Sequence, residues 1–403
     1  MNDAATDSKT DPATGLPLAG IRVVEFVHMV MGPTCGLVLA DLGADVIKVE
    51  PAPDGDNTRR LGGSGAGFFA MCNRNKRSLA VDLKSPDGMA MVRKLLATAD
   101  VLVENFRPGA MDKLGLGPAD LAELNPRLIY CSCKGFLPGP YEHRVALDEV
   151  VQMMGGLAYM TGMPGRPLRA GSSVNDIMGG MFGAIGILAA LNERHITGRG
   201  RHIQSGLFEN NVLLVAQHMA QFAVTGEEAR PMTERRPAWP IYDIFDTSDG
   251  QVFVGVVTDT QWKVFCEAFG LAELANDPTL ATQRDRVAQR HRTIPRAAAA
   301  FQTFTRDTLM ARCEQLGLPY APIARPVELF DDPHLNQSGG LVPTTLPDGT
   351  QTKLPALPLS LDGQRLPMRH DLPKPGQHDT ELAAELGYTP AEIAQLRGLG
   401  VLV

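Results

Sequence analysis

The feature that most constrains the fold of this chain is a repeated alternation of short apolar segments with helical segments, beginning at residue 21. Strand, helix and strand within about 30 residues form a βαβ unit, and successive units build a parallel sheet with helices on both faces. The sequence therefore predicts an α/β fold with a Rossmann-like open parallel sheet. The predicted strands cover residues 21–26, 44–50, 78–83, 101–104 and 128–133, and the predicted helices 32–43, 86–97 and 118–123.

A long apolar segment rich in Gly and Ala extends from Asp176 to His195. Small side chains allow helices to pack closely, so this segment is predicted to be a core or interface helix. Gly198 and Gly200 mark its end. The next elements expected are a returning strand at 201–207 and a second long helix at 209–225.

The composition changes after residue 226, where a charged, proline-bearing stretch indicates a linker. We predict a large domain of residues 1–226 and 331–403 and a smaller α+β domain of residues 227–330. The predicted elements after the linker are a hairpin turning at Asp249–Gly250, helical segments at 260–270 and 293–316, a hairpin turning at Asp348–Gly349, and a pair of short helices between 379 and 399.

Charge and composition exclude several classes of protein. The formal net charge of −7 argues against a nucleic-acid partner, and no apolar run reaches the roughly 18 residues of a membrane span. Residues 1–15 are polar and lack a signal-peptide pattern, so we expect a disordered lead-in and a cytoplasmic protein. The six cysteines form no CxxC pair, which predicts buried free thiols and no metal site.

Five segments, in order along the chain, carry a resemblance to a known family: LAGIRVVEF, GPTCGLVLADLGADVIKVE, NRNKRSLAVDLKSPDG, VENFRPGAMDKLGLG and GSSVNDIMGGMFGAIGILAALNERHITGRGRHI. They resemble the class III CoA-transferases, a family that also contains the 2-methylacyl-CoA racemases. The resemblance implies an enzyme that uses acyl-CoA and a carboxylic acid as substrates, with no permanently bound cofactor. It also implies an interlocked homodimer, in which the large domain binds coenzyme A.

By this resemblance Asp176 is the catalytic nucleophile, because the family carries an aspartate just before its Gly/Ala-rich helix. A carboxylate can attack a thioester to give a mixed anhydride, and the released CoA thiolate can then form an aspartyl-CoA thioester. A second reading remains open from the residues alone. Asp is among the best N-cap residues, so Asp176 could simply cap the helix.

Coenzyme A needs cations for its phosphates and apolar surface along its pantetheine arm. For any single Lys or Arg, the alternative is a solvated surface charge. The resemblance places the phosphate contacts at Lys76 and Arg77, the adenine and pantetheine contacts at Asn105, Phe106 and Arg107, and further contacts at Arg59 and Lys134.

Two alternatives within the family are weighed against CoA transfer. A racemase uses a histidine about 30 residues before the aspartate, but the chain has Leu147 there, and the nearby His143 reads as a loop residue. A non-catalytic subunit of a heteromeric transferase would not need Asp176. The chain also departs from formyl-CoA transferases at Val30 and Pro51, which puts formate and oxalate in doubt. A dicarboxylate such as succinate is the family-level expectation for the donor acid.

Overall fold

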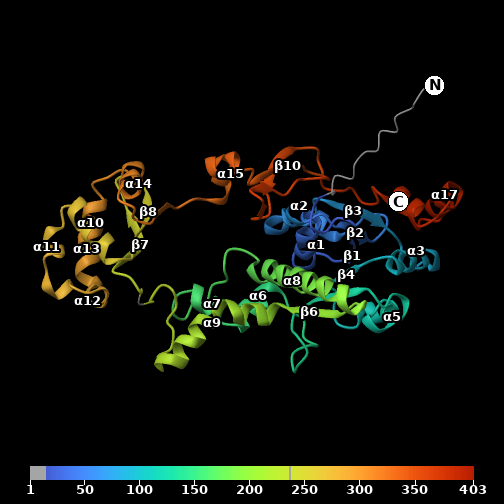
Figure 1. Ribbon diagram of the computed structural model, residues 1–403, viewed down its shortest axis with the longest axis horizontal. Coiled ribbons are helices and arrows are strands. Elements are labelled where there is room, and N and C mark those ends of the chain that lie inside the picture. Colours follow the sequence, from blue (N-terminus) through green and yellow to red (C-terminus); the bar gives the residue numbers. More distant parts are fainter. Residues whose placement is uncertain (1–14, 236) are drawn as a thin grey trace, which may run out of the picture. The chain divides into compact units, whose positions relative to one another are not determined.

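The computed structural model describes residues 15–235 and 237–403, which form two compact units (Figure 1). The first unit comprises residues up to Thr233 together with Pro333–Val403, and the second comprises Glu234–Asp332. The domain division predicted from the sequence, after residues 226 and 330, falls near these positions. The lead-in predicted for residues 1–15 lies, apart from Gly15, outside the described residues.

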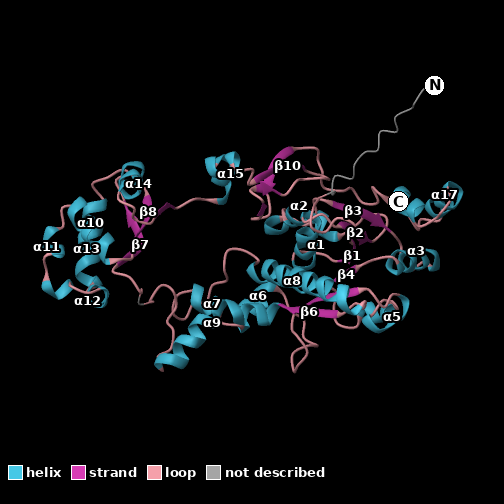
Figure 2. Ribbon diagram, viewed as in Figure 1, coloured by secondary structure: helices cyan, strands magenta, loops and turns pink. Residues whose placement is uncertain are grey.

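The first unit is built on a six-stranded sheet in the order β3-β2-β1-β4-β5-β6, with every neighbouring pair parallel (Figure 2). This confirms the predicted α/β fold with a parallel sheet. The strand order reverses between β1 and β4, and such a reversal leaves a crevice at the carboxyl ends of the strands. The strands are β1 (Arg22–Phe26), β2 (Asp45–Glu50), β3 (Lys76–Ala80), β4 (Val101–Glu104), β5 (Ile129–Lys134) and β6 (His202–Gly206).

One face of the sheet is covered by α1 (Met31–Asp41) and α8 (Val174–Thr197). The two helices lie so close that a Cβ atom on Gly180 would be 2.5 Å from the Met31 carbonyl oxygen and 2.9 Å from the Cys35 nitrogen. Glycine at this position is therefore what permits the contact. By length and apolar composition α8 would also suffice for a membrane span, but 44% of its most apolar window is buried against the rest of the chain.

The opposite face packs against helices from both ends of the first unit, α3 (Pro86–Ala97), α5 (Pro118–Leu124), α16 (Asp379–Glu385) and α17 (Pro390–Gly398). The predicted pair of short C-terminal helices is thus confirmed. Asp379 Oδ1 accepts a hydrogen bond of 2.9 Å from the amide of Ala80, and Leu402 forms an antiparallel bridge with Val81. The end of the chain is in this way fastened to β3.

Shorter elements complete the first unit, and many of them follow the carboxyl ends of strands. A hairpin of β10 and β11 turns around Asp348–Gly349, as predicted. All six cysteines of the chain are buried and free, also as predicted. These elements are η1 (Asn57–Arg60), η2 (Gly63–Gly65), α2 (Phe68–Cys72), α4 (Ala110–Lys113), α6 (Asp148–Met154), α7 (Leu157–Thr161), α9 (Leu207–Thr225), α15 (Pro333–Gln337), β10 (Leu341–Thr345), β11 (Gln351–Pro355), β12 (Ser360–Leu361) and β13 (Gln364–Arg365).

The second unit has its own core around an antiparallel sheet in the order β7-β8-β9. The hairpin predicted at Asp249–Gly250 is present. The single helical segment predicted over 293–316 is wrong, because Thr305 is extended and its hydroxyl caps a new helix. The elements are β7 (Ile241–Asp246), β8 (Gln251–Val256), α10 (Asp259–Ala268), α11 (Ala272–Ala275), η3 (Pro278–Leu280), α12 (Gln283–Ala288), α13 (Arg290–Phe301), α14 (Arg306–Gln315), β9 (Tyr320–Pro322) and η4 (Pro326–Asp331).

Candidate active site

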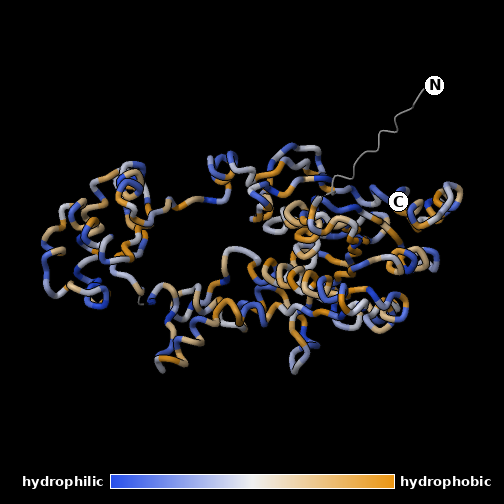
Figure 3. Tube along the Cα trace, viewed as in Figure 1, coloured by the Kyte–Doolittle hydropathy of each residue, from blue (hydrophilic) through white to orange (hydrophobic). Residues whose placement is uncertain are grey.

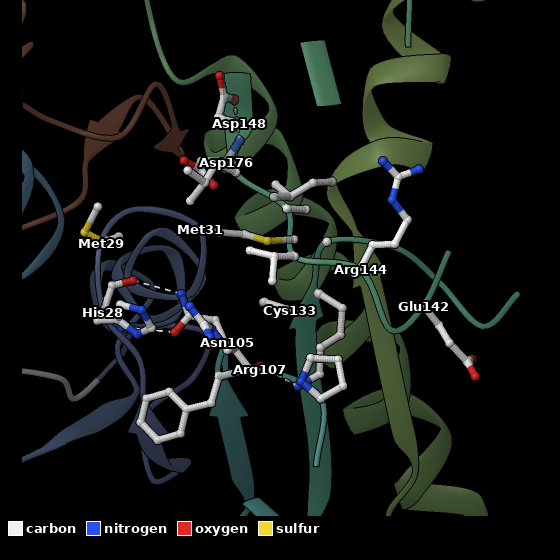
Figure 4. A pocket seen from close by; sticks show the side chains of 18 of the residues that line it. His28, Met29, Met31, Asn105, Arg107, Cys133, Glu142, Arg144, Asp148 and Asp176 are labelled. Atoms are coloured by element: carbon white, nitrogen blue, oxygen red, sulfur yellow. Dashed lines mark hydrogen bonds between the residues drawn. The ribbon is translucent and has the colours of Figure 1, made fainter. Parts of the chain in front are cut away.

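A cavity of about 570 Å³ lies in the first unit, at the carboxyl ends of β1, β4 and β5 (Figure 4). Its wall is made by the residues that follow these strands, by the loop before α6 and by the first turn of α8. This is the place where the strand order reverses, and open α/β sheets bind their ligands there. The size suits part of a large ligand, since small-molecule sites span roughly 300–1,000 Å³.

Asp176 lines the cavity from the first turn of α8. Within the described residues its carboxylate accepts no hydrogen bond from another side chain or from the backbone. Burial and, to a lesser extent, the nearby Asp148 carboxylate raise the pKa of Asp176 to about 7, against the opposing effect of Arg169. A carboxylate without donors around it is a stronger nucleophile than a solvated one, because no hydrogen bond stabilises its lone pairs.

Asp148, the first residue of α6, caps the start of α8. The sequence alone leaves this role open for Asp176. Its Oδ1 atom accepts the amides of Asn175 at 2.8 Å and of Asp176 at 3.2 Å. These two amides would otherwise be unpaired at the start of α8. The side chain of Asp176 is therefore not needed for capping. Sequence reasoning missed Asp148, because a cap donated from another helix leaves no local pattern.

The turn between β1 and α1 forms another side of the cavity, through His28, Met29 and Met31. Asn105, which follows β4, holds this turn with two hydrogen bonds: its Oδ1 accepts the His28 amide at 3.0 Å, and its Nδ2 donates to the His28 carbonyl at 2.8 Å (Figure 4). The ring of Phe106 lies 5.7 Å from that of His28. Burial lowers the pKa of His28, which favours its neutral form.

Positive charge reaches the cavity from Arg107 and Lys134. Arg107 is exposed and makes no ion pair with any residue that the structure describes. Lys134 is partly neutralised, since it forms an ion pair of 2.6 Å with Glu104 and donates to the Phe106 carbonyl at 3.0 Å. Of the predicted site residues, the structure brings together at this cavity Asn105, Phe106, Arg107, Lys134 and Asp176.

Lys76 is not at this cavity, which corrects its expected placement. Its ammonium group is fully buried and has four acceptors, the two carboxylate oxygens of Glu25 at 2.8 and 3.0 Å, the Pro33 carbonyl at 2.9 Å and Asn73 Oδ1 at 3.3 Å. No donor is left for a phosphate. The sequence reading started the strand at residue 78, whereas β3 begins at Lys76 and carries this side chain into the core.

Arg77 and Arg59 are also placed away from the cavity. Arg77 lies at the amino end of β3, where it pairs with Asp45 at 2.7 Å and with Glu385 at 2.6 Å. Arg59 pairs with Glu50 at 2.6 Å and lies over the Phe69 ring, 3.8 Å from its centroid. Arg77 donates five hydrogen bonds to carboxylates of the chain, and Arg59 donates two to Glu50 and one to the Pro373 carbonyl. The ion pairs within the fold explain why Arg59 and Arg77 are basic residues. Neither one forms part of an exposed binding face.

Comparison with known proteins agrees with this fold. The model of CoA-transferase family III matches residues 18–379, and the chain belongs to this family. It is therefore a CoA-transferase. A succinate–glutarate CoA-transferase from Agrobacterium fabrum is 36% identical over 386 residues, which cover 92% of this chain and 96% of the relative.

Two further similar proteins are informative. A succinyl-CoA–D-citramalate CoA-transferase from Chloroflexus aurantiacus is 33% identical over 394 residues, covering 96% of this chain and 98% of the relative. The crystal structure of a CAIB/BAIF family protein from Brucella suis matches with a TM-score of 0.81 at 35% identity, covering 92% of this chain and 99% of that one. The match extends over both units of the fold.

Proposed function

We propose that the protein moves coenzyme A from a dicarboxylyl-CoA, with succinyl-CoA as the donor, to a second carboxylic acid through covalent intermediates on Asp176. The observation that carries this proposal is the Asp176 carboxylate itself, which lines the cavity without a hydrogen-bond donor and has a pKa raised to about 7. The donor is supported by the similar enzymes named for succinate–glutarate and for succinyl-CoA–D-citramalate.

The reaction is a sequence of acyl exchanges. An Oδ atom of ionised Asp176 attacks the thioester carbonyl carbon, the C–S bond breaks, and a mixed anhydride and CoA thiolate result. The thiolate attacks the aspartyl carbonyl and releases the donor acid as its carboxylate, which leaves an aspartyl-CoA thioester. The acceptor carboxylate then attacks this thioester, and the thiolate returns to the new acyl group. Asp176 is regenerated, and no proton is gained or lost.

The surroundings of Asp176 suit these steps. Arg107 and Lys134 supply positive charge for a phosphorylated substrate, and Phe106 supplies an apolar surface. Each tetrahedral intermediate needs donors for its oxyanion. We assign these to the first-turn amides of α1, because that helix begins at Met31 beside the cavity and has no side-chain cap.

A dicarboxylate acceptor has a remote carboxylate that also needs a partner. Arg144 lies in the cavity wall, on the loop before α6, with its guanidinium carbon 5.1 Å from the centre of the Tyr141 ring. In Figure 4 it comes from the opposite side of the pocket to His28 and Met29. We propose that Arg144 binds this remote carboxylate. Leu147, in the same wall, offers no group that could remove an α-proton, but His28 and His143 line the same cavity, so racemisation is one of the outcomes that the experiment below distinguishes.

We further propose that the enzyme is an interlocked cytoplasmic homodimer. The homodimer is supported by exposed apolar side chains on α8 and α9, two helices in which apolar residues are coloured orange in Figure 3. Large exposed apolar patches on a soluble protein mark interaction surfaces. Side chains on this surface that are between 37% and 58% exposed are Met181, Phe182, Ile185, Leu213, Leu214, Met219 and Phe222.

The test is to trap the intermediate. The purified enzyme is incubated with succinyl-CoA, quenched with hydroxylamine and digested, and the peptide that contains residue 176 is examined by mass spectrometry. We expect an aspartyl hydroxamate at Asp176 in the native protein and none in Asp176→Asn. Transfer that continues at the native rate in this variant would overturn the proposal. Deuterium entering the α-carbon without CoA exchange would instead indicate a racemase, and inactivity until a partner chain is added would indicate a non-catalytic subunit.

A further inference from the structure

The turn between β1 and α1 has an unusual backbone. Met29 has a φ angle of +62°, in the left-handed region that side chains other than glycine rarely adopt. Its neighbour His28 and Met29 itself both line the cavity that contains Asp176. A strained residue persists only where its surroundings hold it, and strain of this kind is concentrated at functional sites. The question is what holds the turn.

Thr58, in η1, binds the strained residue directly. Its Oγ1 atom accepts the Met29 amide at 2.9 Å and donates to Asp56 Oδ1 at 2.8 Å. Asp56 Oδ2 forms an ion pair of 2.9 Å with the Lys48 ammonium group, which donates to the Val27 carbonyl at 2.7 Å. These contacts form a continuous chain from the Val27 carbonyl, just before the turn, through Lys48, Asp56 and Thr58 to the Met29 amide within the turn. We call this chain of contacts the relay.

This relay is buried. The exposed fraction of Lys48 is 0%, that of Asp56 is 5%, and that of Thr58 is 2%. Buried hydrogen bonds of this kind are costly to break, because the released donor is left without water or another partner. Asn105 adds a second, independent hold through its two hydrogen bonds to the backbone of His28. The turn is thus fastened from two sides, by η1 and by the residue after β4.

We infer that Thr58 is a positioning residue for CoA transfer: through the Met29 amide it keeps the left-handed turn, and with it one wall of the substrate cavity, in the shape that binds the CoA thioester. This rests on the proposed function only in taking the cavity as the substrate site. Thr58 does not line this cavity but lines an adjoining pocket of about 200 Å³ that shares His28, Met29 and Phe106 with it, so the test must separate an effect through the turn from a direct contact with substrate.

The first experiment compares Thr58→Val with Thr58→Ser. Valine has a similar shape but cannot accept the Met29 amide, whereas serine keeps the hydroxyl. We expect Thr58→Val to raise the KM for succinyl-CoA and the Kd for free CoA about tenfold, the effect of one lost hydrogen bond, and Thr58→Ser to restore both to within about twofold. Equal values for Thr58→Val and the native enzyme would overturn the inference.

A second variant shows whether Thr58→Val acts through the turn or by damaging the fold. Met29→Gly relieves the strain, because glycine adopts a positive φ without penalty. In that background the turn no longer depends on the relay, so adding Thr58→Val should change the Kd for CoA less than about twofold. A full tenfold loss in the double variant would show that Thr58 acts by a route other than the turn, such as direct contact with substrate, and would refute the positioning role.

A matched control uses Asn125, another asparagine whose side chain makes two hydrogen bonds to the backbone. Asn125 donates to the carbonyls of Leu96 at 3.1 Å and of Ala99 at 2.8 Å, away from the cavity. Asn105→Ala should weaken CoA binding, and Asn125→Ala should lower the melting temperature without changing the Kd for CoA. Because the Kd for CoA needs no covalent chemistry, this inference can fail or hold independently of hydroxylamine trapping at Asp176.

Discussion

The two ends of the six-stranded sheet both carry many charged side chains, but the charges are arranged differently. At the carboxyl end, Asp176 has no hydrogen-bond donor and Arg107 has no ion pair among the described residues. At the amino end, a groove of about 760 Å³ is lined by Arg22, Asp45 and Arg77, among others. There Arg22 and Arg77 already have carboxylate partners, Arg22 with Asp45 at 3.0 Å and Arg77 with the same residue at 2.7 Å.

This difference teaches how to tell a binding charge from a structural one. A buried ion whose donors or acceptors are all satisfied within the chain contributes to a fixed architecture and has nothing left for a ligand. An ion that is kept without partners costs free energy, and such a cost is characteristic of functional sites. The density of charge at a strand end does not distinguish a charge that binds a ligand from one that stabilises the fold. The number of its donors and acceptors that are already satisfied within the chain does.

The largest effect that would sharpen this comparison is expected from Asp176→Asn. The substitution removes the proposed nucleophile but keeps the shape, so kcat for transfer from succinyl-CoA to glutarate should fall by at least about 10³-fold. Thermal stability at neutral pH should stay the same or rise, because an unpartnered carboxylate is replaced by a neutral group. Steady-state kinetics and calorimetry measure the two quantities. A large loss of stability with a small loss of kcat would place Asp176 with the structural charges.

The same variant predicts a change in the pH dependence of stability. The pKa of Asp176 is raised from 3.8 to about 7 in the folded chain, so between these values the folded state holds a proton that the unfolded state has lost. The contribution of Asp176 to stability is therefore present at low pH and is lost as the pH rises towards 7. Urea titrations across this range should show a smaller decline for Asp176→Asn than for the native protein.

Lys76→Met should give the next largest effect, on stability and not on substrate binding. It leaves the buried Glu25 carboxylate without its partner, and the free energy of unfolding should fall by about 3–5 kcal/mol. Replacing Glu25 by Gln in the same protein should recover part of this loss. Urea denaturation measures the stability, and the KM for succinyl-CoA serves as the comparison. A raised KM with unchanged stability would return Lys76 to the phosphate-binding role that the family resemblance suggested.

A moderate effect is expected from Asp148→Asn, which keeps an oxygen that can cap α8 but removes a negative charge. The nucleophile must be ionised to attack, so kcat/KM for the native enzyme should rise with pH through about 7 and then level off. Because Asp148 raises the pKa of Asp176, the variant should shift this rising limb to lower pH. A pH profile that does not move, in a protein of native stability, would contradict the electrostatic link between the two carboxyl groups.

The smallest effect is expected from Arg107→Ala. An exposed cation that contacts a phosphate contributes roughly 1 kcal/mol, so the KM for succinyl-CoA should rise about fivefold while the melting temperature stays unchanged. The difference from the native enzyme should shrink at high salt. Succinyl-pantetheine, which lacks the nucleotide, should show no difference between the two proteins. Equal sensitivity to both substrates would mean that Arg107 does not contact the nucleotide end.

Much of the fold could be predicted from the sequence. The spacing of apolar residues, and the glycine, proline and capping residues that end the elements, determine it locally. The helix at Pro86–Ala97 and the strand at Val101–Glu104 have the predicted bounds. The break at Thr305 was missed, since a threonine within an apolar helical pattern reads equally well as an interior residue or as a cap. Which of the two it becomes depends on the tertiary packing of the second unit.

The candidate site was less accessible to sequence reasoning. Residues after strands, such as Asn105 and Lys134, could be assigned to the cavity because topology alone brings them there. Lys76 could not be excluded, because its partner Glu25 lies on another strand and no local pattern reveals the pairing. Asp148 and Thr58 were missed for the same reason. Each acts on a backbone group far away in the sequence, and such a contact exists only once the chain is folded.

The tight seam between α1 and α8 limits how this enzyme could be re-engineered for other acids. No side chain larger than glycine fits at residue 180, and at residue 183 a Cβ atom would already lie 3.2 Å from the sulfur of Cys35. Substitution at Gly180 is thus excluded, and substitution at Gly183 requires the Cys35 side chain to shift. The exposed loop before α6 bears no such restriction, and a library for new substrate preference is best confined to its residues 137–147.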